Sequence, residues 1–230
     1  MDTWTTYRLQ DFLLFSERTY RRLFEAQNEA WWPLPIVLAT AGALLVAVFM
    51  RRARFGVQGG GSIAWVVTAV ALAFVATTFL QTRYAAISPI AEAGYYGFLI
   101  EAFALAFVAS KPPDTNGMAF PRIGIGFALS AIGLIVYPAI GYLRTGALTG
   151  AEWFGTVPDP TAITLLGILS IGIVNRLQMA ALMLIPAIWL VFSALTLQAF
   201  GDLVSWLIFG SIVLAAAALF IPARAHTKSV

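Results

Sequence analysis

Cysteine is absent from this chain of 230 residues, and histidine and lysine are nearly so, because His226 is the single histidine and the lysines are Lys111 and Lys228. Without thiols the chain cannot form disulfide bonds, Fe–S clusters or cysteine-based zinc sites, and thiol catalysis is excluded. His226 stands near the end of the chain, which argues against bis-histidine haem and histidine-ligated chlorophyll. A retinal protein needs a lysine within a late helix, and neither lysine is so placed. We therefore expect no cofactor and no metal site.

Charged residues are also scarce, at 11% of the chain against 60% hydrophobic residues. Soluble domains carry roughly 25% charged residues. So few charges cannot cover a water-exposed surface, and several apolar runs approach the ~20 residues that a membrane-spanning helix needs. The net charge of +3 does not indicate nucleic-acid binding, because arginine and lysine in cytoplasmic loops set the orientation of membrane proteins. We expect the lipid bilayer to be the main partner.

The order of apolar runs and turns predicts an all-α fold, a polytopic transmembrane helix bundle of about seven spans. An alternative with about six spans stays open, because the fifth run is too short to cross the bilayer untilted. The predicted parts are an amphipathic interfacial segment (1–30), a transmembrane helical domain (31–222) and a polar C-terminal tail (223–230). The expected spans lie near residues 31–50, 62–81, 91–110, 122–142, 161–174, 179–197 and 203–221.

The N-terminal segment has the pattern of an amphipathic helix that begins after Ser16, a residue suited to capping. This pattern favours a helix that lies along the membrane surface or over the helix ends. A partner-docking helix or a lid is the alternative. The polar start of the chain is unlike a cleavable signal peptide. Four residues share the predicted buried face at helical spacing: Tyr20, Leu23, Phe24 and Gln27.

Arginine and lysine are unevenly distributed between the two sets of loops. Only Arg83 and Arg144 lie on one side, so the other side is expected to be cytoplasmic, with the N-terminus outside. The four arginines within residues 1–30 do not fit this rule, and the last two helices invert if 161–174 is not a span. Eight positive residues lie on the predicted cytoplasmic side: Arg51, Arg52, Arg54, Lys111, Arg122, Arg176, Arg224 and Lys228.

The loop at 152–161 is the most compact polar motif between the predicted spans. Asp159 is expected to cap the fifth helix, with Pro160 at its first position, so its carboxylate is assigned a structural role. The rest of the loop faces the same side as two other loops and could form an outer-face site; a well-packed turn is the alternative. The candidate outer-face residues are Arg83, Tyr84, Arg144, Glu152, Trp153 and Phe154.

Glu101 lies near the middle of the third predicted span. An ionisable residue within the membrane is costly and is a functional hypothesis by default. It is a candidate proton carrier, cation site or substrate anchor, with Tyr137 as a candidate partner. The alternative is a protonated glutamic acid that hydrogen-bonds a neighbouring helix. Pro138, which follows Tyr137, and Pro186 are each expected to kink the helix that contains them.

Motifs of familiar enzymes are missing from the sequence. There is no Walker lysine loop, no His-Glu-x-x-His, no Gly-x-Ser-x-Gly with a partner histidine, and no intramembrane aspartate pair. We therefore do not expect an enzyme.

Residues 15–33, FSERTYRRLFEAQNEAWWP, resemble the opening of a family of uncharacterised bacterial multi-pass inner-membrane proteins. That family is a domain of unknown function, and some members carry an automatic permease label. The Arg83-Tyr84 loop and residues 154–161, FGTVPDPT, resemble two further blocks of it, so the resemblance covers nearly the whole chain. Trp31-Trp32 departs from the family's single tryptophan before the proline. The resemblance implies a bacterial inner (cytoplasmic) membrane protein but no activity, ligand or catalytic residue.

Two functions remain in view. The first is a small transporter, permease-like or channel-like, with Glu101 on the pathway and the outer loop at its mouth. The alternative is a non-transporting accessory, assembly or scaffold subunit that docks other membrane proteins. Transport predicts that Glu101 lines a polar cavity with a partner such as Tyr137, whereas a scaffold predicts that Glu101 is sealed in a dry helix contact.

Overall fold

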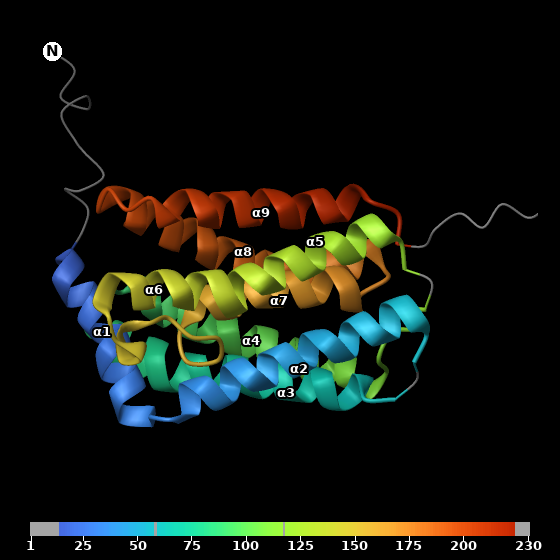
Figure 1. Ribbon diagram of the computed structural model, residues 1–230, viewed down its shortest axis with the longest axis horizontal. Helices are drawn as coiled ribbons and strands as arrows, with labels where there is room; N and C mark the ends of the chain where they lie inside the picture. The colour runs from blue at the N-terminus through green and yellow to red at the C-terminus, as the bar shows by residue number, and fades with distance from the viewer. Residues whose placement is uncertain (1–13, 58, 117, 224–230) are drawn as a thin grey trace, which may run out of the picture.

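The computed structural model describes residues 14–57, 59–116 and 118–223, and this part of the chain is helical with no strand. Residues 1–13 of the predicted N-terminal segment and residues 224–230 of the predicted tail lie outside the described residues. The helices run along one long axis, except α1, which lies across one end of the bundle, here called the α1 end (Figure 1). Their order is α1 (Glu17–Trp31), α2 (Leu34–Phe55), α3 (Gly61–Val75), η3 (Ala76–Tyr84), α4 (Ile90–Ser110), α5 (Phe120–Ala131), η4 (Ile132–Val136), α6 (Tyr137–Thr145), η5 (Leu148–Gly150), α7 (Pro158–Gly172), α8 (Arg176–Ala199) and α9 (Val204–Phe220).

Five helices in the described chain are long and apolar enough to cross a membrane. The predicted all-helical fold with membrane-length helices is therefore confirmed, while the number of spans remains a prediction. Helix α9 is apolar but shorter, with 17 residues. The long apolar helices are α2, α3 with η3, α4, α5 with η4 and α6, and α8.

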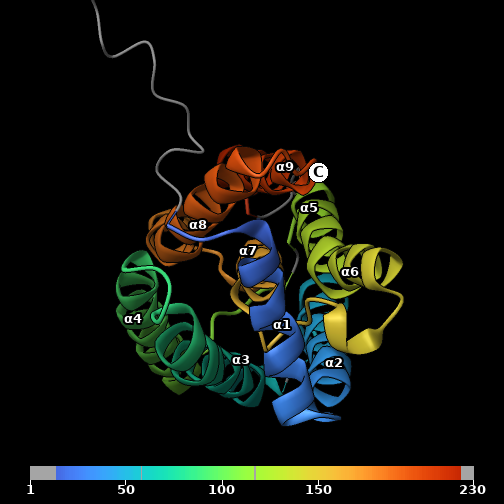
Figure 2. The same cartoon turned by 90° about the vertical axis from the view of Figure 1, so that its left-hand side faces the viewer.

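Helix α7 occupies the centre of the bundle, inside a ring formed by the other helices (Figure 2). All 15 of its residues are buried. Its mostly apolar sequence is compatible with this position, because a helix that is apolar on every side can be buried on every side. The helices of the ring instead expose large apolar side chains on their outer surfaces, for example Phe103, Phe107 and Val70. The axis of the bundle is therefore filled by a protein helix.

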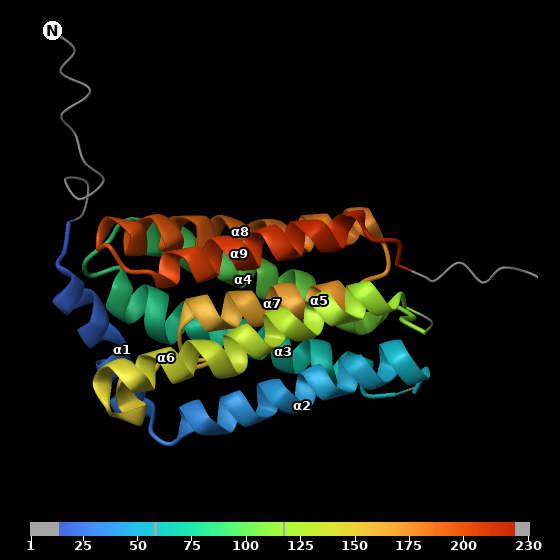
Figure 3. The same ribbon diagram turned by 45° about the horizontal axis from the view of Figure 1, so that its top comes forward.

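Small residues allow α5 to run in close contact with α7 (Figure 3). A Cβ atom on Gly126 would lie 2.7 Å from the carbonyl oxygen of Gly167, and one on Gly167 would lie 2.6 Å from that of Gly126. Gly133 meets α7 in the same way. Such contacts are typical of helix pairs in membranes. Gly124 has no atom within 4 Å of its Cβ position and lies outside this contact.

Opposite charges lie at the two ends of α7. Asp159 is in its first turn, and the buried Arg122 donates from Nε to the carbonyl oxygen of Ser170 at 2.9 Å and from Nη2 to that of Ile173. Both charges oppose the partial charges of the helix dipole. The prediction that Asp159 caps this helix is wrong. Val157 is the N-cap residue, and the Asp159 side chain makes no cap hydrogen bond because it points to other helices.

Within the described residues, two π-helical segments interrupt two of the long apolar helices. Segment η3 continues α3 and ends at Tyr84, and η4 ends immediately before Tyr137, whose backbone N–H donates to the carbonyl oxygen of Ile132. The missing N–H of Pro138 is accommodated directly after this turn. Segments of this kind are frequent at functional sites.

Candidate functional site under helix α1

The carboxylate of Asp159 is the centre of a buried polar cluster. Its oxygens accept hydrogen bonds from Tyr137 Oη at 3.0 Å, Trp189 Nε1 at 2.8 Å and Ser193 Oγ at 2.5 Å. Asp159 is 1% exposed, and all three of these donors are neutral side chains. These four residues are called the Asp159 cluster below.

Three helices bring the Asp159 cluster together at the α1 end. Trp189 and Ser193 are four residues apart on α8 and so share one face of that helix. Tyr137 begins α6, and Asp159 lies in the first turn of α7, where the helix dipole favours a negative charge. Gly94 of α4 makes room for the indole, because a Cβ atom there would lie 2.5 Å from Cζ3 of Trp189.

Helix α1 lies across this end of the bundle (Figure 2) and buries aromatic side chains against it. Tyr20 is buried, and its ring lies 5.7 Å from the ring of Tyr84, which in turn lies 6.1 Å from that of Trp189. Phe24 stacks on Phe79 at 5.4 Å. Burial, followed by the nearby charge of Asp159, raises the pKa of Tyr20 well above its usual range, so Tyr20 stays a neutral phenol.

Amide side chains hold α1 against the bundle. Gln27 donates from Nε2 to Thr78 Oγ1 at 2.9 Å, and its Oε1 accepts from Arg83 Nε at 2.6 Å. Asn28 donates from Nδ2 to the carbonyl oxygen of Ala151 at 2.6 Å. Both amides are fully buried, so these bonds replace water that the side chains would otherwise bind.

Asp202 joins α1 to α6 through two arginines. It accepts from Arg21 Nη2 at 3.0 Å and from both terminal nitrogens of Arg144 at 2.7 and 2.6 Å. Burial alone would raise the pKa of Asp202, but the bonds from Arg144 and the Val204 N–H outweigh it, and the pKa is lowered. This arrangement is called the Arg21–Asp202–Arg144 bridge below.

Glu152 is a second carboxylate beside the Asp159 cluster. It is half-buried in the loop before α7. Burial and the charge of Asp159 raise the pKa of Glu152, and the charges of Arg21 and Arg144 oppose that rise. Glu152 therefore takes up a proton more readily than an exposed glutamate.

The other predicted outer-face residues have separate roles. As described above, Arg83 bonds Gln27 of α1, and the ring of Tyr84 lies next to that of Tyr20. Arg144 bonds Asp202. Trp153 donates from Nε1 to the carbonyl oxygen of Leu148 at 2.9 Å, and Phe154 is buried against Gly42 of α2. The last two contacts are those of a well-packed turn.

Glu101 does not meet its predicted partner in the structure. It is 2% exposed, and its Oε1 atom has no hydrogen-bond partner. Its helix α4 packs against α3, η3 and α8, whereas Tyr137 belongs to α6 and bonds Asp159. Helices α4 and α6 lie on opposite sides of α7 (Figure 2). Glu101 is thus sealed between helices.

Sequence reasoning missed the residues that surround Asp159. Asp159 itself was assigned to capping, and Trp189, Ser193 and Asp202 were not singled out. The available signal was the position of Asp159 between two prolines in the first turn of an apolar run, where an acid is not needed as a cap. Nothing in the sequence indicates that Trp189 and Ser193 face it.

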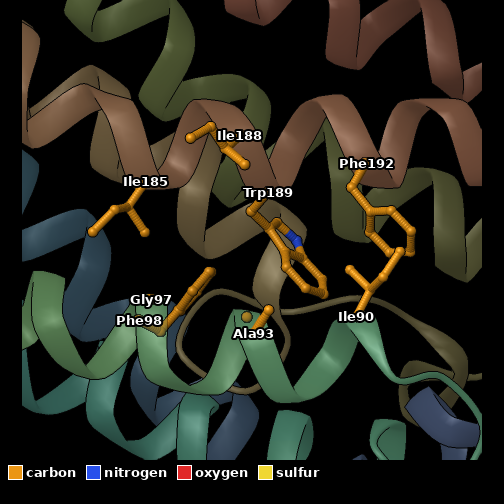
Figure 4. Close-up of a pocket in the computed structure, with 9 residues that line it drawn as sticks. Ile90, Ala93, Gly97, Phe98, Ile185, Ile188, Trp189 and Phe192 are labelled. Carbon is orange, nitrogen blue, oxygen red and sulfur yellow. The ribbon is translucent and has the colours of Figure 1, made fainter.

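An apolar groove of about 230 Å³ lies between α4 and α8, and Trp189 is one of its lining residues (Figure 4). Its walls include Gly97 and Phe98 of α4 and Ile185 and Ile188 of α8. The same indole donates a hydrogen bond to Asp159, which is not one of the lining residues.

The described residues define an all-helical bundle whose apolar helices are compatible with a membrane protein. The chain belongs to a family of unknown function, DUF6064, whose model matches residues 17–228. No curated protein and no solved structure matches the chain.

Proposed function

We propose that the protein is a small permease-like transporter in which the Asp159 cluster binds the transported or coupling ion. One observation carries this proposal: a carboxylate buried among apolar helices is held by neutral donors alone. An ionised group in such surroundings is costly and is kept where a function requires it. This proposal transfers the role predicted for Glu101 to Asp159.

The position of Asp159 on α7 supports the proposal. Transporters often form their ion and substrate sites at the ends of discontinuous helices within the bundle. Helix α7 has 15 residues, all buried, and Asp159 stands in its first turn. The π-helical segments η3 and η4 end beside the cluster as well, at Tyr84 and Tyr137.

The chemistry of the site favours a proton or a small monovalent cation. The negative charge of an ionised Asp159 would repel an anion. The three side chains that donate hydrogen bonds to Asp159 leave no space for a bulky ligand. Glu152 lies half-buried next to it and provides a second carboxylate that can exchange a proton with water.

Flux measurements in proteoliposomes test this function. Separate gradients of H⁺, Na⁺ and K⁺ are applied, and uptake is followed for the wild type, Asp159→Asn and the control Glu92→Gln, an exposed acid. We expect flux of one of these ions, reduced at least about ten-fold by Asp159→Asn and unchanged in the control. Absence of flux for all three ions, or wild-type flux in Asp159→Asn, contradicts the proposal.

A non-transporting accessory, assembly or scaffold subunit is the second candidate function. The filled axis of the bundle favours it, because α7 leaves no open route along the centre. The sealed position of Glu101 favours it too. This function predicts that no ion flux is measured. It also predicts that the protein, extracted from native membranes, migrates as part of a larger complex.

Location and class complete the proposal. The distribution of arginine and lysine supports an N-terminus outside and a C-terminus in the cytoplasm, and the family resemblance implies a bacterial inner membrane. The α1 end, and with it the Asp159 cluster, then faces the outside. No enzymatic activity is proposed.

A further inference from the structure

We propose that α1 is a movable lid over the Asp159 cluster, held shut by the Arg21–Asp202–Arg144 bridge. The inference names the regulation of the proposed ion site and so rests on the proposed function. The carboxylate of Asp159 is 1% exposed in the structure. An ion from the aqueous side therefore reaches it only when the residues that cover it move.

The position of α1 is the first argument. It lies across the end of the bundle rather than within it (Figures 1 and 2). Tyr20 is the residue of α1 nearest to the cluster, since its hydroxyl interacts with Ser193, which itself bonds Asp159. Moving Tyr20 and Phe24 outward separates these two rings from Tyr84 and Phe79 of η3.

The nature of the contacts is the second argument. Helices α5 and α7 meet backbone to backbone through glycines, a contact that cannot open without separating the bundle. Helix α1 is instead attached through side chains: the hydrogen bonds of Arg21, Gln27 and Asn28 and the ring contacts of Tyr20 and Phe24. Water can replace the hydrogen bonds when the helix moves. A segment of this kind opens more readily than the core.

The positions of the contacts along α1 favour opening at its N-terminal end. Its C-terminal end continues into α2 through the exposed residues Trp32 and Pro33, so this end stays tethered. Arg21 lies near the opposite end and reaches Asp202 in the turn between α8 and α9. Breaking this ion pair weakens the attachment of the part of α1 that carries Tyr20, which is then held by ring contacts to Tyr84 and Phe200 and can swing about Trp32-Pro33.

The natural absence of cysteine makes a direct test simple. Ser193→Cys places a thiol in the cluster, and Ser170→Cys places one in the buried far half of α7. The purified full chain in detergent is treated with a water-soluble maleimide, and the labelling rate is measured. Each thiol is combined with Arg21→Ala, which breaks the bridge, or with Arg18→Ala, which removes an exposed arginine from the same helix.

We expect Arg21→Ala to speed labelling of the Ser193→Cys thiol at least about ten-fold, as local opening predicts. Arg18→Ala should leave the rate unchanged, and the Ser170→Cys thiol should stay unreactive in every background. Asp202→Asn provides a second way to weaken the bridge and should act like Arg21→Ala.

Equal labelling of the Ser193→Cys thiol in the Arg21→Ala and Arg18→Ala backgrounds would overturn the lid. So would a parallel rise at the Ser170→Cys thiol, because it would mean that the whole bundle loosens. Labelling is independent of transport, so the two proposals fail separately. Absent flux with the expected labelling contradicts only the proposed function, and Asp159-dependent flux with unchanged labelling contradicts only the lid.

Discussion

Arg122 and Asp159 mark the two ends of one buried helix: the guanidinium binds carbonyl oxygens at the end of α7, and the carboxylate lies in its first turn. Arg122 bonds carbonyl oxygens and the sulfur of Met179. Its role in the structure is therefore to satisfy the last carbonyl groups of a helix that water cannot reach.

Replacement of this arginine should destabilise the protein. Arg122→Met leaves the carbonyl oxygens of Ser170 and Ile173 without their donor, and each buried unsatisfied group costs about 1–3 kcal/mol. For the two groups together we expect a loss of about 2–6 kcal/mol in the free energy of unfolding, measured by denaturation in detergent. Arg51→Met, at an exposed arginine of α2, is the control and should have little effect. Equal stability of the two variants would show that Arg122 does not anchor α7.

The glycines between α5 and α7 give a second prediction. Gly167→Ala places a Cβ atom 2.6 Å from the carbonyl oxygen of Gly126, which the backbone relieves only by moving the helices apart. We expect a loss of about 1–3 kcal/mol in stability. Gly124→Ala is the matched control, since its Cβ meets nothing within 4 Å, and alanine there should be neutral or stabilising by about 0.5–1 kcal/mol. The thermal midpoints of both variants check this, and a stable Gly167→Ala protein would refute the close contact.

Gly94 should act on the site through Trp189. The added Cβ of Gly94→Ala would lie 2.5 Å from the indole, which must shift and so weaken its bond to Asp159. We expect Gly94→Ala and Trp189→Phe to lower ion flux by a similar factor, on the order of ten-fold for a charge-assisted bond worth about 1.5–3 kcal/mol. Gly97→Ala is the control, because its Cβ would lie 3.2 Å from Cγ2 of Ile185, a tight contact that a small shift of this side chain relieves, and would not meet Trp189. Flux that falls in Trp189→Phe but not in Gly94→Ala would disprove this coupling.

The Arg21–Asp202–Arg144 bridge predicts how stability depends on pH. The pKa of Asp202 is lower in the folded protein than the value of about 3.9 for an unfolded chain. Its contribution is therefore fully present above about pH 4 and is lost as the pH falls through the folded value. We expect Asp202→Asn to be less stable than the wild type at neutral pH, and this difference to shrink below about pH 4. The charged groups around Asp202 are Arg21, Arg144, Glu17 and Glu152. Repeating the comparison with Glu152→Gln shows how much of the pH dependence of stability comes from Glu152. A difference that is constant from pH 3 to pH 7 would contradict the assignment.

Helix positions followed from the sequence more readily than the site did. The run at 91–110 predicted α4 to within a residue, because apolar length and flanking turns are local properties. The burial of α7 on every side is not local, since it depends on which helices surround it. The same holds for Asp159. Its place next to a proline correctly indicated a helix start, but its partners Trp189 and Ser193 come from a helix 30 and 34 residues further along the chain.

The burial of α7 on all sides has a consequence for how much variation the sequence can bear. A helix at the edge of a bundle has a tolerant face, and on α4 the exposed Phe103 and Phe107 can change to other apolar residues at little cost. Helix α7 has no such face. A scan of substitutions should therefore show tolerance that repeats every three to four residues along α4, and no repeat at all along α7.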